Sequence, residues 1–401
     1  MAASSYVSSS SSSSFDRPAT GGLPPSFPNL ELILGGSSHM SLPKLASDTK
    51  ISLPRSTKKG LAKTAPQELG ISPSQFKQAC DFLSKNHFPA KSFYQSSKTS
   101  EAPLSFLCHR RKSRTTVYLS PTSLHKSPQA TIKLATTLKG KTVALKLIPK
   151  AHFKEIEKEV YHRLSKKKIA KQLFVIGPHF EYQKISKTEQ RLISKVALVL
   201  PYKPEGTLVD FVNHYLDQEQ RVPEKLSRSV CAQLAEGAAY LHQQGIVHLD
   251  LKLENCLIET REGEIKVLIA DFGHASLIGS HVPVAFGSLG YRDPVLFRKP
   301  LSYTTVAQPS LDVWSAGMVM SIIANSATFQ HWTKSFHGDE HYLADMREDS
   351  FEYYKVHHLE GADKPTTLNW VISQCLQLDP AKRMSASQAA QSIKALPPLP
   401  V

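Results

Sequence analysis

The spacing of apolar residues changes along the chain, and each spacing predicts a different kind of element. From about residue 115 to 149, short segments alternate or cluster β-branched residues, which is typical of strands. These segments are 115–120, 130–138 and 141–149, with a tight turn at Lys139-Gly140 between the last two. The pattern predicts three antiparallel strands.

A helical spacing follows, and two apolar segments come after it. The helix has apolar residues at Phe153, Ile156, Val160 and Leu164. The apolar segments 173–182 and 192–202 are predicted as further strands. Beyond Val209 the spacing is mostly helical, notably over 226–242 and 311–324. Strands first and helices later predict an α+β protein in two lobes.

The first hundred residues have a different composition, in which serine, proline and glycine dominate. Ser8 to Ser14 are seven consecutive serines. Such a segment buries too little apolar surface to offset the entropy of ordering, so we predict a disordered leader over 1–70. Ser72 or Ser74 can cap a short helix whose shared apolar face is Phe76, Ala79, Cys80 and Leu83. We therefore interpret 71–114 as a partly helical linker or docking segment.

Several features bear on where the protein is found. No apolar stretch reaches the roughly 18 to 20 residues of a membrane span. The five cysteines are scattered without a CxxC pair, which favours reduced thiols and a cytoplasmic protein. The leader lacks the apolar run of a secretory signal. Its composition suits an organelle transit peptide and also resembles the serine-rich leaders of bacterial effectors delivered into host cells, so both alternatives stay open.

The net charge of +15 is unevenly distributed. Residues 1–114 carry +9, residues 115–200 carry +12, and the remainder carries −6. This division fits a two-lobed protein whose lobes do different jobs. A basic adaptor that binds nucleic acid or acidic membranes through residues 1–200 is an alternative, but the few aromatic residues among its lysines argue against nucleic acid.

The stretch from His248 to Asn255, followed by Asp271-Phe272-Gly273, carries the most informative chemistry. A carboxylate at Asp250, an amine at Lys252 and an amide at Asn255 can together orient a hydroxyl, neutralise a phosphate and hold a metal ion. Asp271 supplies a second oxygen ligand, which a hard cation such as Mg²⁺ requires.

These residues resemble the catalytic and DFG loops of the eukaryotic-type protein kinase family, and the resemblance extends over about 115–398. The other matching segments are Val143-Ala144-Leu145-Lys146 (the VAIK strand), Leu198 to Lys203 (the hinge), Asp312 to Gly317 (DxWxxG), and Leu378-Asp379-Pro380 with Arg383 (DPxxR). The resemblance implies a small β-rich lobe over about 115–202 and a larger helical lobe over about 203–398.

The resemblance also implies how ATP is bound. Lys146 is expected to contact the α- and β-phosphates. The backbone carbonyl of Pro201 and the amide of Lys203 are expected to face adenine. The predicted helix contains three glutamates that could pair with Lys146: Glu155, Glu157 and Glu159. Glu157 is the one followed by apolar residues three, four and seven positions later, on the same helix face. We therefore expect Glu157 to be the partner of Lys146, with the alternative that all three are surface partners of nearby lysines.

The implied reaction is transfer of the ATP γ-phosphoryl group to a serine or threonine hydroxyl of a protein substrate. Asp250 would orient the hydroxyl and accept its proton, Lys252 would counter charge on the phosphoryl group, and Asn255 with Asp271 would hold Mg²⁺. Lys252 and the pair Gly287-Ser288 resemble the serine/threonine branch. Small-molecule kinases are a rival, but the GxxGY and DPxxR segments resemble kinases of proteins.

The chain departs from the family in the loop that should cover the phosphates. Where GxGxxG is expected, residues 121–129 contain no glycine, although Ser123 or Lys126 could provide substitute contacts. This departure keeps a second hypothesis open, in which the protein is a pseudokinase that serves as a nucleotide-binding or protein-binding scaffold without turnover.

Two further departures concern control. Leu249 replaces the arginine that often binds an activation-loop phosphate, which argues against that switch, and Ser276, Ser280 and Ser288 are interpreted as ordinary loop serines. Val295 stands where a glutamate usually pairs with the late arginine. Arg383 must therefore pair with Asp293, water or another acid.

Overall fold

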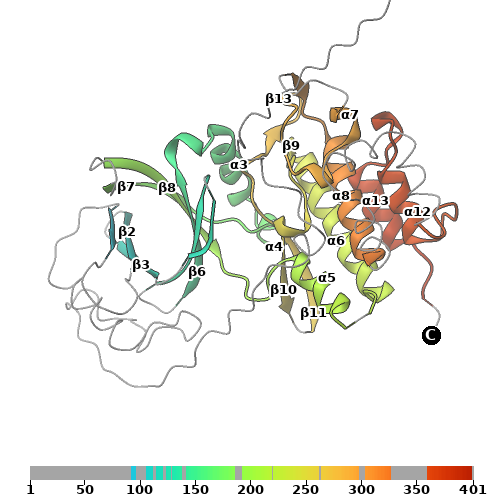
Figure 1. Cartoon of the computed structure of the whole chain (residues 1–401), viewed down its shortest axis with the longest axis horizontal. Coiled ribbons are helices and arrows are strands. Elements are labelled where there is room, and N and C mark those ends of the chain that lie inside the picture. The colour runs from blue at the N-terminus through green and yellow to red at the C-terminus, as the bar shows by residue number, and fades with distance from the viewer. Residues whose placement is uncertain are drawn as a thin grey trace, which may run out of the picture.

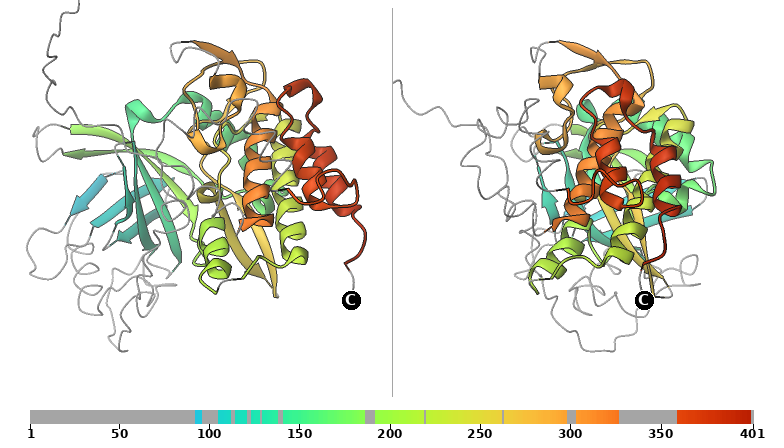
Figure 2. Two further views of the ribbon diagram at one scale, coloured as in Figure 1. Left: turned by 45° about the vertical axis from the view of Figure 1, so that its right-hand side comes forward. Right: turned by 90° about the vertical axis from the view of Figure 1, so that its right-hand side faces the viewer.

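The computed structural model describes residues 92–95, 105–111, 114–120, 123–127, 129–137, 141–185, 192–218, 220–261, 263–297, 303–326 and 359–399. These residues form a strand-rich lobe and a helical lobe, which lie side by side in Figures 1 and 2. The predicted α+β fold in two lobes is confirmed. The leader predicted over 1–70, the helix predicted near 72–83 and the turn at 139–140 lie outside the described residues.

One sheet of eight strands makes up the first lobe, in the order β3-β2-β1-β7-β8-β6-β5-β4. The strands are β1 (Ser92–Gln95), β2 (Ser105–Arg111), β3 (Arg114–Ser120), β4 (Ser123–Lys126), β5 (Thr131–Thr137), β6 (Thr142–Pro149), β7 (His179–Ile185) and β8 (Leu192–Pro201). Because β3 also pairs with β5, the sheet closes on itself.

The inside of this closed sheet is an apolar core of its own. Val143, Leu145 and Leu147 alternate along β6 and are at most 5% exposed. Leu107 of β2 and Tyr118 of β3 belong to the same core from the opposite wall, where β2 and β3 lie across from β6 in Figure 1. Strands β2 and β3 therefore cover the face of β6 that is opposite to Lys146.

Two interpretations of this lobe need correction. The linker predicted over 71–114 contains β1 and β2, which are strands of the sheet. The predicted boundary at residue 115 falls within β3, which pairs with β2 from Ser105↔Ser120 to Arg111↔Arg114. These strands escaped prediction because β1 has four residues and β2 ends in a polar run, so neither shows a sustained alternation.

The strand predicted over 173–182 is wrong in its first half. The chain forms the short helix α4 (Ala170–Leu173), and only residues from His179 onward belong to β7. Phe174 makes an isolated parallel bridge to Ile269 of the second lobe, and Val175 N–H donates to Ile269 O at 2.9 Å. This apolar run is buried because it connects the two lobes.

The helix α3 (Glu155–Ser165) lies between the sheet and the second lobe. Its buried residues are Glu157, Val160, Tyr161 and Leu164. Val160 and Leu164 were predicted, whereas Phe153 precedes the helix and Ile156 is only half-buried. The helical lobe contains α5 (Leu208–Leu216), α6 (Glu224–Gln243), α7 (Pro294–Phe297), α8 (Pro309–Ala324), α12 (Leu368–Cys375) and α13 (Ala386–Lys394). The predicted helices over 226–242 and 311–324 correspond to α6 and α8.

Helix α8 is apolar on all sides because it lies at the centre of this lobe. Helix α6 packs against it and against α13, and α12 and α13 lie on the side away from the strands (Figures 1 and 2). Three described cysteines, Cys231, Cys256 and Cys375, are buried and free, as expected for reduced thiols. No helix among the described residues is long and apolar enough to cross a membrane.

Three small strand pairs belong to the helical lobe. They are β10 (Cys256–Arg261) with β11 (Glu264–Ile269), β9 (Ile246–Val247) with β12 (Ser276–Leu277), and β13 (His281–Pro283) with β14 (Thr304–Val306). These pairs carry the loops that hold the candidate catalytic residues.

Candidate active site

Asp312 of α8 holds the loop that carries Asp250 through hydrogen bonds to its backbone. Both carboxylate oxygens of Asp312 accept backbone N–H bonds, from His248 and Leu249, at 2.7 Å each. The Nε2 atom of His242 lies 3.0 Å from the same carboxylate. Leu249 has φ of 64°, a left-handed conformation that costs free energy for a side chain with a Cβ. Asp312 therefore stabilises a strained turn that aims Asp250.

Replacing Asp312 by asparagine should lower the free energy of unfolding by about 3 kcal/mol, because an amide cannot accept both backbone N–H bonds and Asp312 is fully buried. Urea unfolding followed by circular dichroism measures this loss. Asp363→Asn, at an exposed position, is the matched control. A loss below about 1 kcal/mol for Asp312→Asn would show that the carboxylate is not needed to hold the loop.

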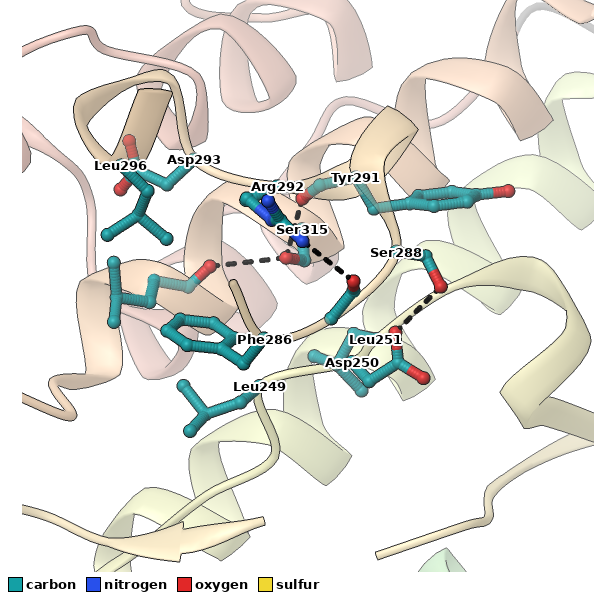
Figure 3. Close-up of a pocket in the computed structure, with 12 residues that line it drawn as sticks. Leu249, Asp250, Leu251, Phe286, Ser288, Tyr291, Arg292, Asp293, Leu296 and Ser315 are labelled. Atoms are coloured by element: carbon teal, nitrogen blue, oxygen red, sulfur yellow. Dashed lines mark hydrogen bonds between the residues drawn. The ribbon is translucent and has the colours of Figure 1, made fainter. Parts of the chain in front are cut away.

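Asp250 itself is surrounded by polar partners. Asn255, in the short 3-10 helix Leu253–Asn255, donates from Nδ2 to Asp250 O at 2.8 Å and to Oδ2 at 3.0 Å. Ser288 Oγ donates to Asp250 Oδ1 at 2.9 Å (Figure 3). Lys252 Nζ donates to Ser288 Oγ at 2.7 Å and lies 3.6 Å from Asp250 Oδ2. The structure thus brings the three predicted residues of this loop together and adds Ser288.

Lys146 and Asp271 meet on the other side of the site. Lys146 Nζ lies 2.5 Å from Asp271 Oδ1; Lys146 lies within β6, and Asp271 follows the end of β11 by two residues. Gly273 N–H also donates to Asp271 Oδ1, at 3.2 Å. Burial would raise the pKa of Asp271, but Lys146 and Gly273 outweigh it and lower that pKa. Asp271 is therefore a carboxylate at neutral pH.

Hydrogen bonds join the Asp250 loop to the segment that carries Asp271. Ala270 N–H donates to Asn255 O at 2.7 Å. His248 Nε2 lies 3.0 Å from Ala270 O, which can only accept, so the ring donates from Nε2 and its Nδ1 accepts from Asp250 N–H at 3.3 Å. These bonds join the loop that carries Asp250 and the segment that carries Asp271 into one hydrogen-bonded unit.

Phe272 packs between helix α3 and the Asp250 loop. Its ring is fully buried and makes an edge contact with Tyr161 of α3, with ring centroids 5.5 Å apart. On its other sides it contacts Phe174 at 5.9 Å and the ring of His248 at 5.3 Å. The aromatic contacts connect α3, the inter-lobe segment and the Asp250 loop.

Glu157 lies on this face of α3, but the expected ion pair with Lys146 is not formed. Lys146 pairs with Asp271 instead, and Glu157 Oε1 is buried without a hydrogen-bond partner. Burial raises the pKa of Glu157 to about 7; the positive charge of Lys146 opposes this rise only in part, and the negative charge of Asp271 adds to it. In this state Glu157 is close to half protonated at neutral pH.

This raised pKa predicts a pH dependence of stability. Between pH 4.5 and about 7 the folded chain binds more protons than the unfolded chain, so the contribution of Glu157 to stability falls as pH rises. The free energy of unfolding of Glu157→Gln should equal that of the natural protein near pH 4 and exceed it by about 3 kcal/mol above pH 7. Chemical unfolding across this range measures the difference. Parallel stability curves for the two proteins would contradict the raised pKa.

The segment 121–129, which was predicted to be a loop over the phosphates, contains a strand. Residues Ser123–Lys126 form strand β4, which pairs with β5. The connection is a tight turn in which Ser127 N–H donates to Ala130 O at 2.8 Å and Ala130 N–H donates to Ser127 Oγ at 3.1 Å. Two backbone amides of this turn are therefore already used within it.

The residues expected to form the hinge lie at the end of β8 and just after it. Pro201 is the last residue of β8, next to Val143 of β6 in the ladder. Lys203 follows, and its side chain turns toward the second lobe, where Nζ lies 2.6 Å from Glu259 Oε1 of β10. The adenine contacts expected of the Pro201 and Lys203 backbones stay a prediction.

Two residues of the site were missed in the sequence. Ser288 was interpreted as an ordinary loop serine, although the Gly287-Ser288 pair had marked its segment. Asp312 was noted only as part of a matching segment. No local pattern shows that either residue contacts the Asp250 loop, because their contacts span 38 and 64 positions.

Comparison with known proteins agrees with this geometry. The model of the protein kinase domain family matches residues 129–393. The chain is 28% identical over 274 residues to human NUAK family SNF1-like kinase 2, which covers 67% of this chain and 38% of that protein. It is 28% identical over 198 residues to the bovine phosphorylase b kinase gamma catalytic chain, liver/testis isoform, covering 48% and 45%.

A third relative is the calcium and calcium/calmodulin-dependent serine/threonine-protein kinase of Lilium longiflorum, 31% identical over 194 residues, covering 48% of this chain and 34% of that protein. The chain spans less than half the length of each of these relatives. The family model covers well over half of the chain, and the strand-rich lobe, the helical lobe and the joined loops have the expected order. The chain belongs to the protein kinase family.

Proposed function

We propose that the protein transfers the γ-phosphoryl group of ATP to serine or threonine hydroxyls of a protein substrate, with Mg²⁺. The observation that carries this proposal is the hydrogen-bonded unit formed by the two loops. Hydrogen bonds join the loop of Asp250, Lys252 and Asn255 to the segment that carries Asp271, and Asp271 pairs with Lys146; these contacts support the proposal.

Asp250 is the group best placed to bind the attacking hydroxyl. Its Oδ1 accepts from Ser288 and its Oδ2 from Asn255, so the carboxylate is oriented before any substrate binds. It would orient the hydroxyl and accept its proton as the phosphoryl group moves. Lys252, held by Ser288, would neutralise charge on that group. Lys146 would bind the α- and β-phosphates.

The residues expected to hold the metal fit a hard cation. The Asn255 amide donates two hydrogen bonds from Nδ2 toward Asp250, which turns its oxygen away from Asp250. The Asp271 side chain is 41% exposed and is ionised. Two such oxygens with phosphate oxygens and water suit Mg²⁺. When bound there, Mg²⁺ would supply positive charge to the transferring phosphates.

The choice of serine and threonine hydroxyls rests on two features. Lys252 and Ser288 form a bonded pair beside Asp250, as the resemblance to the serine/threonine branch implies. The Lilium longiflorum relative is named a serine/threonine-protein kinase. The purified chain, incubated with γ-labelled ATP, Mg²⁺ and lysate proteins, should yield labelled phosphoserine or phosphothreonine after acid hydrolysis. Label on phosphotyrosine alone would overturn this assignment.

One observation favours the second hypothesis, a pseudokinase scaffold. Two amides of the turn between β4 and β5 bond within the turn, and the segment contains no glycine, so this turn offers few donors to phosphates. The two hypotheses differ in the label assay. Nucleotide binding without any transfer, by protein whose fold is intact, would favour the scaffold.

A further inference from the structure

The segment that follows helix α13 is rich in proline and takes no part in the candidate active site. Its sequence is Leu396-Pro397-Pro398-Leu399-Pro400, and Lys394 stands three positions before the first of these prolines. The chain leaves α13 on the side of the helical lobe that faces away from the strand-rich lobe (Figures 1 and 2). The segment therefore has a P-x-x-P pattern preceded by a positive charge, which is typical of ligands for aromatic-lined grooves.

The sequence of this segment restricts its backbone to one conformation. Each proline ring fixes φ at about −65°. Leu396, Pro397 and Leu399 each precede a proline, which excludes the helical region for them and favours polyproline II. Residues 397–399 accordingly belong to no helix or strand. A segment that is extended before it binds loses little conformational entropy in the complex.

Polyproline II has three residues per turn, so positions three apart share one edge of the helix. In this conformation Leu396 and Leu399 share one edge, and Pro397 and Pro400 share the next edge. Pro398 falls on the third edge. Two Leu-Pro pairs are thus repeated along one side, as required by a groove that has two apolar slots between aromatic rings.

The middle of the segment lies open to solvent. Pro397 and Pro398 are exposed, whereas Leu396 is half-buried against the core of the helical lobe. Arg228 Nη1 of α6 donates to Pro397 O at 2.5 Å. Because this hydrogen bond lies at the surface, water can take the place of either group. The contact holds the segment against α6 without covering its prolines.

Lys394, the last residue of α13, supplies the positive charge. Its Nζ pairs with Glu236 of α6, and the side chains of Lys394 and Glu236 are 62% and 34% exposed. An ion pair that is open to solvent in this way contributes little to stability. An acidic residue of a partner, placed beside a proline-binding groove, can therefore replace Glu236.

We propose that residues 394–400 are a ligand for an SH3-type domain, a protein module with an aromatic-lined groove, and that the fitting domains have acidic residues beside this groove. The groove takes the two Leu-Pro pairs, and the acidic residues take Lys394. On binding, Leu396 leaves the surface of the core and Pro397 O exchanges Arg228 for the partner. The partner brings the kinase to proteins that carry such a domain. The inference goes beyond the proposed function, because this binding requires no phosphoryl transfer.

The test is isothermal titration of the full chain into a panel of purified SH3 domains that have acidic residues beside the groove. The natural chain should bind at least one with a dissociation constant of about 100 μM or tighter. Pro397→Ala and Pro400→Ala should each weaken binding by about tenfold, because each loses a ring from the groove and a restriction of the free backbone. Pro365→Ala, at an exposed proline outside the segment, is the matched control and should bind like the natural chain.

Two results of this titration would overturn the proposal. One is the absence of binding to every SH3 domain of the panel. The other is equal affinity of the natural chain, Pro397→Ala and Pro400→Ala. WW and EVH1 domains, which also bind proline-rich segments, are titrated in parallel. Binding to these domains and not to SH3 domains would assign the segment to another class of partner and would likewise overturn the proposal.

Two charge variants test the contacts that are exchanged on binding. Arg228→Ala should bind the SH3 domain about threefold tighter, because the segment is then released from α6 in a larger fraction of molecules. Arg221→Ala, at an exposed arginine before α6, is the control for the lost charge and should not bind more tightly. Lys394→Ala should weaken binding several-fold at low salt and less in about 0.5 M salt. Unchanged affinity in both Arg228→Ala and Lys394→Ala would overturn the assigned exchange.

Discussion

Replacing Asp250 by alanine should lower kcat for protein phosphorylation by about 10²- to 10⁴-fold, the range expected when a positioned general base is lost. The reason is local, because Asp250 is the carboxylate held by Ser288 and Asn255. The measurement is the initial rate of label transfer from γ-labelled ATP at saturating nucleotide. Asp250→Asn should show a similar loss, since the amide keeps the shape and lacks the basic oxygen.

Asp217→Asn, at an exposed position after α5, is the matched control and should keep the natural rate. The affinity for ATP should change little in Asp250→Ala, because Asp250 is assigned to the hydroxyl and not to the nucleotide. Equal label from the natural protein and from Asp250→Ala would mean that the transfer comes from a contaminating kinase, and it would eliminate the catalytic assignment.

Deleting residues 1–120, and with them β1 to β3, should leave the protein unfolded or aggregated. Leu107 of β2 and Tyr118 of β3 pack in one core with the apolar inner residues of β6 and β8, including Val143, Leu145 and Val199. Exposing several such side chains costs about 1.5–3 kcal/mol each, and the sum is comparable to the total stability of a domain, about 5–15 kcal/mol. Soluble yield and thermal unfolding measure the effect.

The matched control is deletion of residues 1–91, which keeps every strand of the closed sheet. It should melt within a few degrees of the full chain. If the protein without residues 1–120 also folds and melts at the same temperature, the first three strands are dispensable. The stability of the remaining sheet would then not require that it be closed.

The order of the main elements was predictable because each carries its own pattern. The alternation of Val143, Leu145 and Leu147 indicated a strand, and the residues after Glu157 indicated the buried face of a helix. Arg383 needed a carboxylate, and Asp293 was among the candidates. In each case the requirement is set by neighbouring residues or by the cost of a buried charge.

Other features depend on contacts between distant segments and have no local signal. The closure of the sheet rests on the pairs Tyr118↔Thr137 and Leu119↔Thr136, which no periodicity reveals. The buried run after α4 has the composition of a strand, yet it crosses to Ile269. The partner of Lys146 was also misjudged, because its amine pairs with Asp271 while Glu157 Oε1 is buried without a hydrogen-bond partner.

The most direct test of the proposed site is a crystal structure of the full chain with Mg²⁺ and a non-hydrolysable ATP analogue. The proposal predicts adenine against Pro201 and Lys203, and an Mg²⁺ ion bound by oxygens of Asn255 and Asp271 at about 2.1 Å. Lys146 should contact the phosphates. A nucleotide bound outside the gap between the lobes, or a metal that contacts neither Asn255 nor Asp271, would contradict it.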